Sequence, residues 1–215
     1  MICVSMDEQY DINYLKALTD ISFAEIRMDC MDLTVNDIGD IFSQPVKFIA
    51  TCRPGFHDDC KRKEYLIAAI EAGAKYVDIE VESDIADKRE IMEKARSRGC
   101  KVIMSFHDYD KTPDSEKLEQ IAALCFSEGA DIAKIACKVN YITDSARLIG
   151  LLGQEDFKDR LVVVGMGEKG KITRIAGPFL GSLFTYASPA ENKSTADGQI
   201  EKKRLENIMR SLTNG

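Results

Sequence analysis

Two side chains with complementary chemistry belong to consecutive apolar segments of this sequence. Lys134 lies within Asp131-Ile-Ala-Lys-Ile-Ala136, and His107 ends the preceding apolar segment, which begins at Lys101. A lysine inside an apolar strand loses water, which favours its neutral amine and makes it a candidate nucleophile. An imidazole titrates near neutrality and can move protons. The two residues therefore predict covalent imine chemistry on a carbonyl substrate.

Each of these residues also has a purely structural explanation. The ammonium of Lys134 can snorkel from a strand end to solvent along its flexible stem. His107 can have no role beyond a loop hydrogen bond with Asp108. The chain contains just two histidines. The position of His107 on the strand before Lys134 favours catalysis, because adjacent strands can bring two side chains to one substrate.

Other polar residues are candidates for binding that substrate. Glu25 and Arg27 share one face of a predicted strand, where a carboxylate and a guanidinium would hold hydroxyl groups. Arg53 and Arg174 add planar forks of donors suited to a carboxylate, although simple surface solvation is the alternative for each. The run at residues 194–199 is either a flexible loop or a lid that supplies hydroxyl and amide contacts.

Composition excludes several classes of function. The chain has 215 residues, 45% of them hydrophobic and 30% charged, as in an ordinary globular protein. A net charge of -7 argues against a nucleic-acid partner. No apolar run approaches the roughly 18 residues that span a bilayer, and residues 1–6 lack the leader and length of a signal peptide. We therefore predict a cytoplasmic protein with no membrane partner.

The cysteines and a glycine-rich motif predict structural roles rather than cofactor binding. Seven cysteines form no C-x-x-C pair and fall largely in apolar segments, which predicts reduced thiols in a core. Cys52, His57 and Cys60 lack the spacing of common zinc sites. The G-x-G-x-x-G motif at residues 165–170 comes late in the chain, without the acidic residue that a dinucleotide site requires. We expect no metal and no cofactor.

Short apolar segments predict the strands that position these residues. They span residues 2–6, 22–29, 46–52, 76–82, 101–106, 132–137, 161–166 and 183–188, with helical patterns between most of them. Their alternation without a linker predicts an α/β fold, a single-domain (β/α)8 TIM barrel over residues 1–215. The helices of residues 7–21 and 30–45 are too weakly patterned to place.

The clearest helical pattern begins at Thr112 and Pro113, a cap residue followed by proline, and ends before Gly129. Its predicted buried face consists of Leu118, Ile121, Ala122 and Cys125. Gly73 and Gly99 are predicted to end two further helices.

Residues of one parity on each strand point into such a barrel. This set includes Glu25, Arg27, Thr51, Arg53, Asp78, Glu80, Glu82, Ser105, His107, Lys134 and Met166. We expect these side chains to converge near the carboxyl ends of the strands, where barrel active sites are built.

Together these residues resemble type I 3-dehydroquinate dehydratase, a Schiff-base lyase of the shikimate pathway of aromatic amino acid biosynthesis. The resemblance runs over nearly the whole chain, and the order and spacing of its motifs make it specific. The motifs are Val4-Ser-Met6, Glu25-Ile-Arg-Met-Asp29, Thr51-Cys-Arg53, Asp78-Ile-Glu80, residues 105–113, residues 131–136, residues 166–174 and Ala196-Asp-Gly-Gln199.

The resemblance implies a metal-independent homodimer that converts 3-dehydroquinate to 3-dehydroshikimate. Lys134 would form the imine with the substrate ketone, and His107 would be the general acid and base. The remaining substrate contacts would come from Ser5, Glu25, Arg27, Arg53, Met166, Arg174, Tyr186, Thr195 and Gln199.

The chain departs from the family pattern in several respects. A glutamate that often follows the Thr-x-Arg motif and supports the catalytic histidine is absent, and Glu80, Asp58 or Asp59 are the candidates to replace it. Thr195 stands where a serine is usual, beside Ser194, and Tyr186 stands near a usual phenylalanine. The chain also begins almost at the first predicted strand. Many relatives carry an extension that covers the barrel floor, so we expect greater core exposure at that end.

Two other functions fit part of this pattern. A class I aldolase-like barrel also uses a strand lysine, and it would cleave a carbon–carbon bond in a phosphorylated sugar. A non-catalytic barrel would bind the ligand without turnover, an alternative motivated by the missing glutamate. Arginines suited to a carboxylate favour the dehydratase over the aldolase.

Overall fold

The computed structural model describes residues 1–7, 12–15, 21–190 and 195–213. Over these residues one sheet contains eight strands in the order β7-β6-β5-β4-β3-β2-β1-β8. The strands are β1 (Ile2–Met6), β2 (Phe23–Arg27), β3 (Lys47–Thr51), β4 (Tyr76–Glu80), β5 (Lys101–Asp108), β6 (Ile132–Lys138), β7 (Leu161–Met166) and β8 (Thr185–Ala187). Parallel strands that alternate with helices confirm the predicted (β/α)8 barrel fold.

Helices follow the strands along the chain. They are α1 (Ile12–Leu15), α2 (Val35–Phe42), α3 (Asp59–Ala72), α4 (Ile85–Arg98), α5 (Ser115–Ser127), α6 (Ile142–Leu151), α7 (Lys171–Ala176) and α8 (Lys202–Thr213). Short 3-10 turns are η1 (Met28–Cys30), η2 (Glu155–Phe157), η3 (Glu168–Gly170) and η4 (Gly177–Phe179). In the part of the chain that is described, no helix has the length and apolar character needed to cross a membrane.

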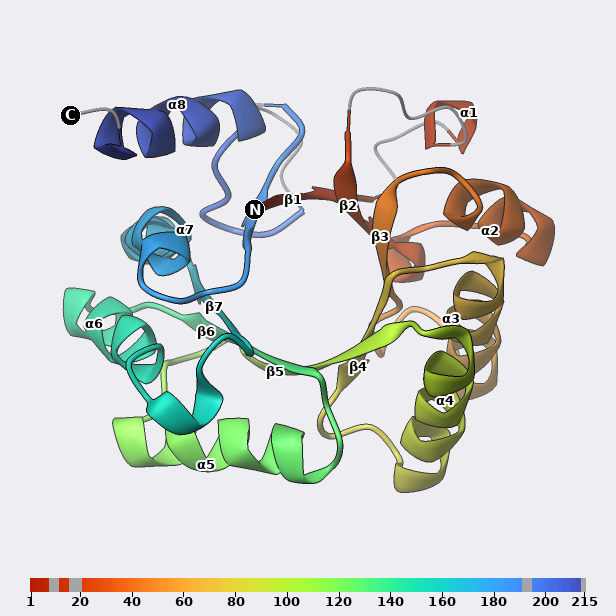
Figure 1. The fold of residues 1–215 in the computed structure, drawn as a ribbon, viewed down its shortest axis with the longest axis horizontal. Helices are drawn as coiled ribbons and strands as arrows, with labels where there is room; N and C mark the ends of the chain where they lie inside the picture. The colour runs from red at the N-terminus through yellow and green to blue at the C-terminus, as the bar shows by residue number, and fades with distance from the viewer. Residues whose placement is uncertain (8–11, 16–20, 191–194, 214–215) are drawn as a thin grey trace. The chain divides into compact units, whose positions relative to one another are not determined.

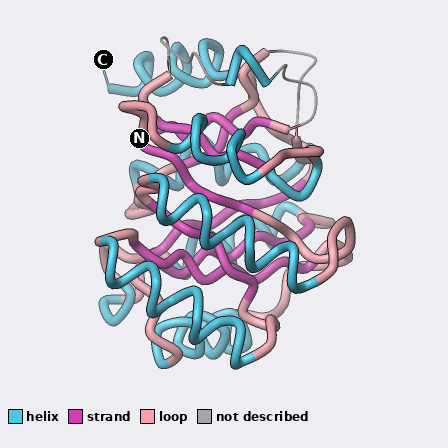
Figure 2. The backbone as a smooth tube through the Cα atoms, turned by 90° about the vertical axis from the view of Figure 1, so that its right-hand side faces the viewer, coloured by secondary structure: helices cyan, strands magenta, loops and turns pink. Residues whose placement is uncertain are grey.

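By its internal contacts the chain divides into two compact units. The amino-terminal unit is Ser5–Met104, and the carboxyl-terminal unit combines Met1–Val4 with Ser105–Gly215. In the amino-terminal unit, β2, β3 and β4 pair in parallel, and α2, α3 and α4 lie along their outer side (Figure 1). Figure 2, in which this unit faces the viewer, shows its helices in front of the strands.

Capping residues mark the ends of the helices in the amino-terminal unit. The Asp58 carboxylate accepts a hydrogen bond from the Lys61 N–H at the start of α3. Gly73 and Gly99 end α3 and α4 with φ of 118° and 65°, which confirms their predicted role. A capping box between Thr34 and Asp37 begins α2, the helix that hydrophobic periodicity alone did not place.

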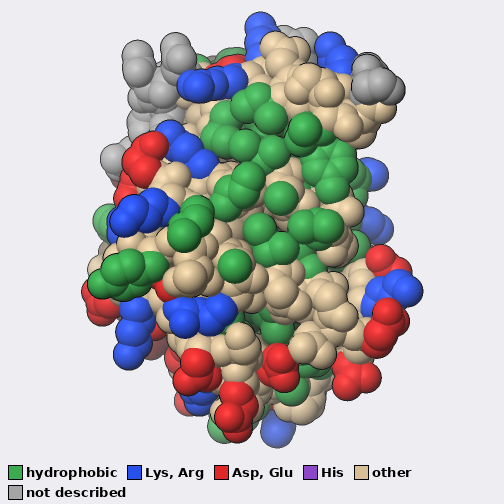
Figure 3. All heavy atoms as spheres, turned by 90° about the vertical axis from the view of Figure 1, so that its left-hand side faces the viewer, with side chains coloured by type: hydrophobic (Ala, Val, Ile, Leu, Met, Phe, Trp, Pro, Cys, Tyr) green, Lys and Arg blue, Asp and Glu red, His purple; other side chains and the backbone are tan. Residues whose placement is uncertain are grey.

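In the carboxyl-terminal unit, β6 and β7 pair so that Lys134 is opposite Val162 and Lys138 is opposite Met166. β1 pairs with β8 in the same unit. On the face shown in Figure 3, hydrophobic side chains gather on the surface of this unit. Ile172 on α7, Phe179 on η4 and Leu212 on α8 are 43%, 44% and 62% exposed, and α7 contacts both neighbouring elements.

The predicted start of α5 was wrong by two residues. Its N-cap is Asp114, whose carboxylate accepts from the Lys117 N–H at 2.8 Å. The Thr112 hydroxyl instead donates to the Lys138 carbonyl at 2.8 Å, which ties the β5–α5 loop to the end of β6. The predicted buried face is correct, because Leu118, Ile121, Ala122 and Cys125 are all buried.

Four strands also differ from the predicted ones in where they begin or end. β2 stops at Arg27 because the chain turns into η1, and β8 is confined to three residues. β4 ends at Glu80, so Glu82 is exposed beyond the strand and does not join the inward set. β5 runs on to Asp108, which places His107 inside the strand.

Candidate active site

Lys134 lies mid-strand in β6 and is only 5% exposed, which excludes the snorkelling alternative. Its Nζ atom is 4.6 Å from the centroid of the Tyr186 ring on β8. The next residue of the same parity, Ala136, has no side chain beyond Cβ.

Arg174 lies beside the same aromatic residue. It is located on α7, is 1% exposed, and donates from Nη1 to the Tyr186 carbonyl at 3.5 Å. Tyr186 is 3% exposed, so ring and guanidinium are both withdrawn from water. The structure thus brings Lys134, Tyr186 and Arg174 together: an amine, an aromatic face and a buried cation that suits a carboxylate.

His107 is partly exposed in β5, and its ring stacks on Tyr109, with centroids 5.9 Å apart and an interplanar angle of 17°. Tyr109 is 67% exposed. The neighbouring Asp108 accepts hydrogen bonds from the backbone N–H groups of Asp110 and Lys111, at 3.0 and 2.9 Å. Asp108 therefore closes its own turn, while the imidazole is oriented by an aromatic stack.

In the amino-terminal unit, Glu25 is the centre of a buried hydroxyl–carboxylate cluster. The carboxylate is on β2 in a residue 4% exposed, and it accepts from Ser5 Oγ at 2.5 Å and from Thr51 Oγ1 at 3.0 Å. The three residues come from adjacent strands and have inward parity. Their contacts confirm that polar groups converge within this unit.

Arg53 is held by two carboxylates of β4. It is 7% exposed and donates to both Asp78 oxygens at 2.9 Å and to Glu80 Oε1 at 2.5 Å. Burial alone would lower the pKa of Arg53, but the charges of Asp78 and Glu80 outweigh burial and raise it. The guanidinium is therefore a fixed cation.

Arg27 is oriented by a residue that the sequence reasoning did not include in the site. Its Nε and Nη2 atoms donate to Asp29 Oδ1 and Oδ2 at 3.0 and 2.7 Å, a bidentate pair. Burial opposes ionisation of Asp29, but the hydrogen bonds and charge of Arg27 prevail and hold its pKa below the ordinary value. The two-residue spacing of Arg27 and Asp29 in the sequence was the available signal for this pair.

The three candidates to replace the missing glutamate all have structural partners in the amino-terminal unit. Asp58 caps α3, and Asp59 pairs with Arg62 at 2.6 Å while 75% of its side chain is exposed. Glu80 is paired with Arg53. Their local roles are therefore a helix cap, a surface ion pair and an arginine clamp.

The late polar run forms a compact turn. The Gln199 amide donates from Nε2 to Thr195 Oγ1 at 2.9 Å and accepts from the Thr195 N–H at 2.9 Å. Met166, the last residue of β7, is 7% exposed. Ser194 lies outside the described residues.

The glycine-rich motif at the end of β7 serves close backbone packing. A Cβ atom on Gly170 would approach the Gly165 carbonyl to 2.4 Å, and one on Gly165 would meet Gly170 at 2.9 Å. The glycines therefore let η3 fold back onto β7, which explains the motif without a dinucleotide.

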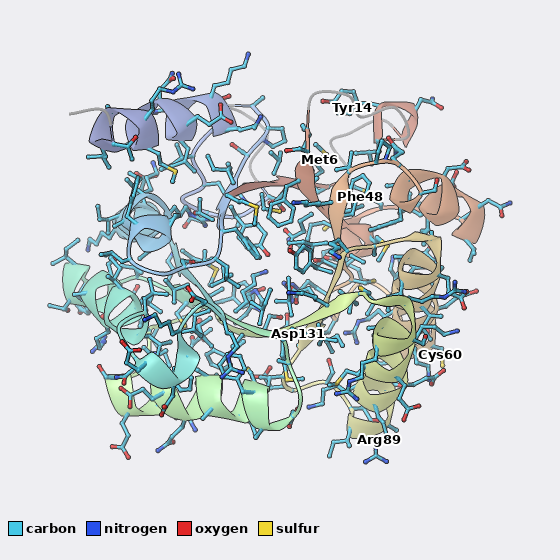
Figure 4. The ribbon with its side chains drawn as sticks, in the orientation of Figure 1. Met6, Tyr14, Phe48, Cys60, Arg89 and Asp131 are labelled. Carbon is cyan, nitrogen blue, oxygen red and sulfur yellow. The ribbon has the colours of Figure 1, made fainter. Side chains whose placement is uncertain are left out.

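The cysteines do not form a metal cluster. Cys60 is exposed on α3 (Figure 4), whereas Cys52 is buried, and its burial raises the pKa of the Cys52 thiol to about 12. Among the residues for which positions are described, no group of three His, Cys, Asp or Glu side chains is arranged to hold a metal ion.

Comparison with known proteins identifies the family. The family model described as Type I 3-dehydroquinase matches residues 2–215. A 3-dehydroquinate dehydratase from Methanococcus maripaludis is 33% identical over 223 residues, which covers 99% of this chain and 100% of the relative.

Solved structures of 3-dehydroquinate dehydratases are also similar to this chain. The 3-dehydroquinate dehydratase from Aquifex aeolicus has a TM-score of 0.82 and 27% identity, covering 98% of both chains. A type I 3-dehydroquinate dehydratase from Clostridium difficile has a TM-score of 0.85 at 22% identity, covering 99% of this chain and 92% of its own, and shows the same fold. The chain belongs to the type I 3-dehydroquinase family.

Proposed function

We propose that this chain is a hydro-lyase that converts 3-dehydroquinate to 3-dehydroshikimate through a Schiff base on Lys134. The observation that carries the proposal is the burial of Lys134, 5% exposed beside the Tyr186 ring, in a member of this family. Because the Lys134 side chain does not reach solvent, a role as nucleophile is the better explanation for a lysine at this position.

The reaction begins when the neutral Lys134 amine attacks the ketone carbon of the substrate. His107 protonates the hydroxyl of the resulting carbinolamine, and water leaves to give an iminium ion. The iminium acidifies the adjacent ring carbon, because it accepts the electron pair released by deprotonation. His107 removes that proton and forms an enamine.

The enamine then expels the ring hydroxyl. Its electron pair returns to form a conjugated iminium, and His107 donates the proton that converts the hydroxyl to water. A further water molecule hydrolyses the iminium, His107 takes up the proton that this step releases, and the product leaves Lys134 as a free ketone. One water is lost overall, and both His107 and Lys134 return to their starting states.

Nine residues are proposed to contact the substrate. In the carboxyl-terminal unit, Arg174, Tyr186, Met166, Thr195 and Gln199 contact the ring and its substituents. In the amino-terminal unit, Ser5, Glu25, Arg27 and Arg53 bind hydroxyl and carboxylate groups. We propose a single catalytic domain over residues 1–215 and no cofactor. Preformed pairs such as Arg27 with Asp29 support this assignment, because a preorganised donor loses less freedom on binding.

We further propose that the protein is a cytoplasmic homodimer. Exposed apolar side chains on α7, η4 and α8 of the carboxyl-terminal unit (Figure 3) support an association surface. Sedimentation equilibrium tests the dimer, and a monomer at all protein concentrations would contradict it. Fractionation of cells that express the protein tests its location.

Borohydride reduction in the presence of 3-dehydroquinate tests the reaction, because reduction converts a reversible imine to a stable amine. We expect one adduct, mapped by peptide mass to Lys134, and 3-dehydroshikimate in the unreduced sample. Lys94, which pairs with Glu71 on the surface, is the matched control, and Lys94→Met should leave both results unchanged. No adduct and no turnover would favour a non-catalytic barrel, whereas carbon–carbon cleavage of a phosphorylated sugar would favour an aldolase.

A further inference from the structure

One ion pair joins the end of β6 to the segment 195–199, which carries two of the proposed substrate contacts. Lys138 Nζ lies 2.8 Å from Asp197 Oδ2, and the two side chains are 34% and 63% exposed. The partners are 59 positions apart in the sequence. The pair therefore fixes a tertiary contact rather than a local turn.

A second, uncharged anchor lies beside the ion pair. The Gly167 N–H, just after β7, donates to the Asp197 carbonyl at 3.1 Å. Gly198 has φ of 78°, and a Cβ atom placed there would be 2.4 Å from the Gly167 carbonyl oxygen. The backbone of the segment is thus in direct contact with the end of β7, which only glycine permits at this position.

The segment itself is internally braced. The Thr195 and Gln199 side chains are joined at 2.9 Å, and the Gln199 N–H donates to the Ala196 carbonyl at 3.3 Å. These hydrogen bonds couple the two proposed substrate contacts to each other across Asp197, which lies between them. Whatever fixes Asp197 also fixes Thr195 and Gln199.

Lys138 belongs to the same face of β6 as the proposed nucleophile. Lys138 has the same parity as Lys134 and is four residues further along, about 13 Å at roughly 3.3 Å per residue. Lys138 is opposite Met166 in the β6–β7 register. The positive charge of Arg174, the proposed carboxylate ligand, also acts on Asp197. The contact therefore belongs to the carboxyl ends of β6 and β7.

We infer that Lys138 and Asp197 are positioning residues that hold Thr195 and Gln199 over the carboxyl ends of β6 and β7 for substrate binding. This inference rests on the proposed function. The backbone anchor involves one hydrogen bond, and the ion pair adds an attraction that favours the same docked arrangement. The carboxylate stays ionised near neutrality, since the hydrogen bond and charge of Lys138 hold the pKa of Asp197 below its ordinary value.

Asp197→Asn and Lys138→Met each remove the attraction with little change in side-chain size. An exposed pair of this kind changes an equilibrium by about two- to fivefold, so KM for 3-dehydroquinate should rise by about that factor while kcat stays within about twofold. At high salt the KM of the wild type should approach that of each single variant, because screening weakens the ion pair in the wild type. The exchanged double variant, Lys138→Asp with Asp197→Lys, should recover most of the loss.

The control is Lys94→Met, which removes a surface pair of similar exposure between α3 and α4, in which Lys94 and Glu71 are 2.6 Å apart and 35% and 45% exposed. It should leave KM unchanged. The inference is overturned if both single variants keep the wild-type KM, or if they lose thermal stability with no change in KM. Borohydride trapping on each variant separates the two claims: wild-type protein without adduct or turnover overturns the proposed function, and this inference with it. An intact adduct with unaltered KM overturns only the positioning role.

Discussion

The Nζ atom of Lys134 lies 4.6 Å from the centre of the Tyr186 ring, so the aromatic face is turned toward the nitrogen that would carry the imine. A ring face attracts a cation. The proposed iminium intermediate carries its positive charge on this nitrogen and the carbon bonded to it. The same contact that holds the lysine can therefore stabilise the intermediate that the reaction must form.

Replacement of Tyr186 tests this relationship. Tyr186→Phe keeps the ring, and we expect kcat/KM to remain within about twofold of the wild type. Tyr186→Ala removes a cation–π contact of about 0.5 to 2 kcal/mol, so kcat/KM should fall about 3- to 30-fold. Steady-state kinetics on both variants provide the measurement. Equal losses in the two variants would assign the effect to the hydroxyl and not to the ring.

Lys134→Ala and His107→Ala should separate imine formation from elimination. Without its amine, Lys134→Ala should give no borohydride adduct and no turnover. His107→Ala should still form the adduct while kcat falls about 10²- to 10⁴-fold, since proton transfer loses its catalyst. Intact mass and product absorbance report the two steps independently. Normal turnover by Lys134→Ala would defeat the Schiff-base assignment.

Much of this architecture was predictable because its causes are local. Continuous apolar runs specified the parallel strands, and strand parity specified that Glu25 and Thr51 share the inner face, where they are 3.0 Å apart. Glu82 was misplaced for a related reason. Parity was extended past Glu80, whereas the strand ends there and the face of later residues is no longer defined.

Other features depend on where loops return in space, which periodicity does not encode. Thr112 looked like a helix cap, but its hydroxyl donates to the Lys138 carbonyl, and Asp114 caps the helix instead. The Lys138–Asp197 pair joins residues 59 positions apart and requires the loop after β8 to dock on β7. Burial of Lys134 was the expectation on which the function most depended, and the structure supports it.

Arg53→Ala should strongly destabilise the protein. The substitution leaves the buried Asp78 carboxylate without the guanidinium that donates to both of its oxygens. Breaking a buried ion pair from one side costs about 3 to 5 kcal/mol of unfolding free energy. Urea unfolding followed by circular dichroism measures the loss. A loss below about 1 kcal/mol would mean that the pair behaves like one on the surface.

Asp58→Ala tests which acid supports His107. Because Asp58 caps α3, its removal should cost about 1 kcal/mol of stability. We expect the pH profile of kcat to be unchanged. A shifted profile would instead make Asp58 the replacement for the missing glutamate.

Asp29 should contribute to stability in a pH-dependent way. Its folded-state pKa lies below the ordinary value of 3.8, since Arg27 outweighs the opposing effect of burial. A carboxyl with a depressed pKa stabilises the folded state fully above its unfolded pKa, and this stabilisation is lost as the pH falls through the folded pKa. The stability advantage of the wild type over Asp29→Asn should therefore be constant near neutrality and shrink below about pH 4. Urea midpoints measured for both proteins across this range give the difference directly. An advantage that grows toward acid pH would show that burial, and not Arg27, controls the carboxyl.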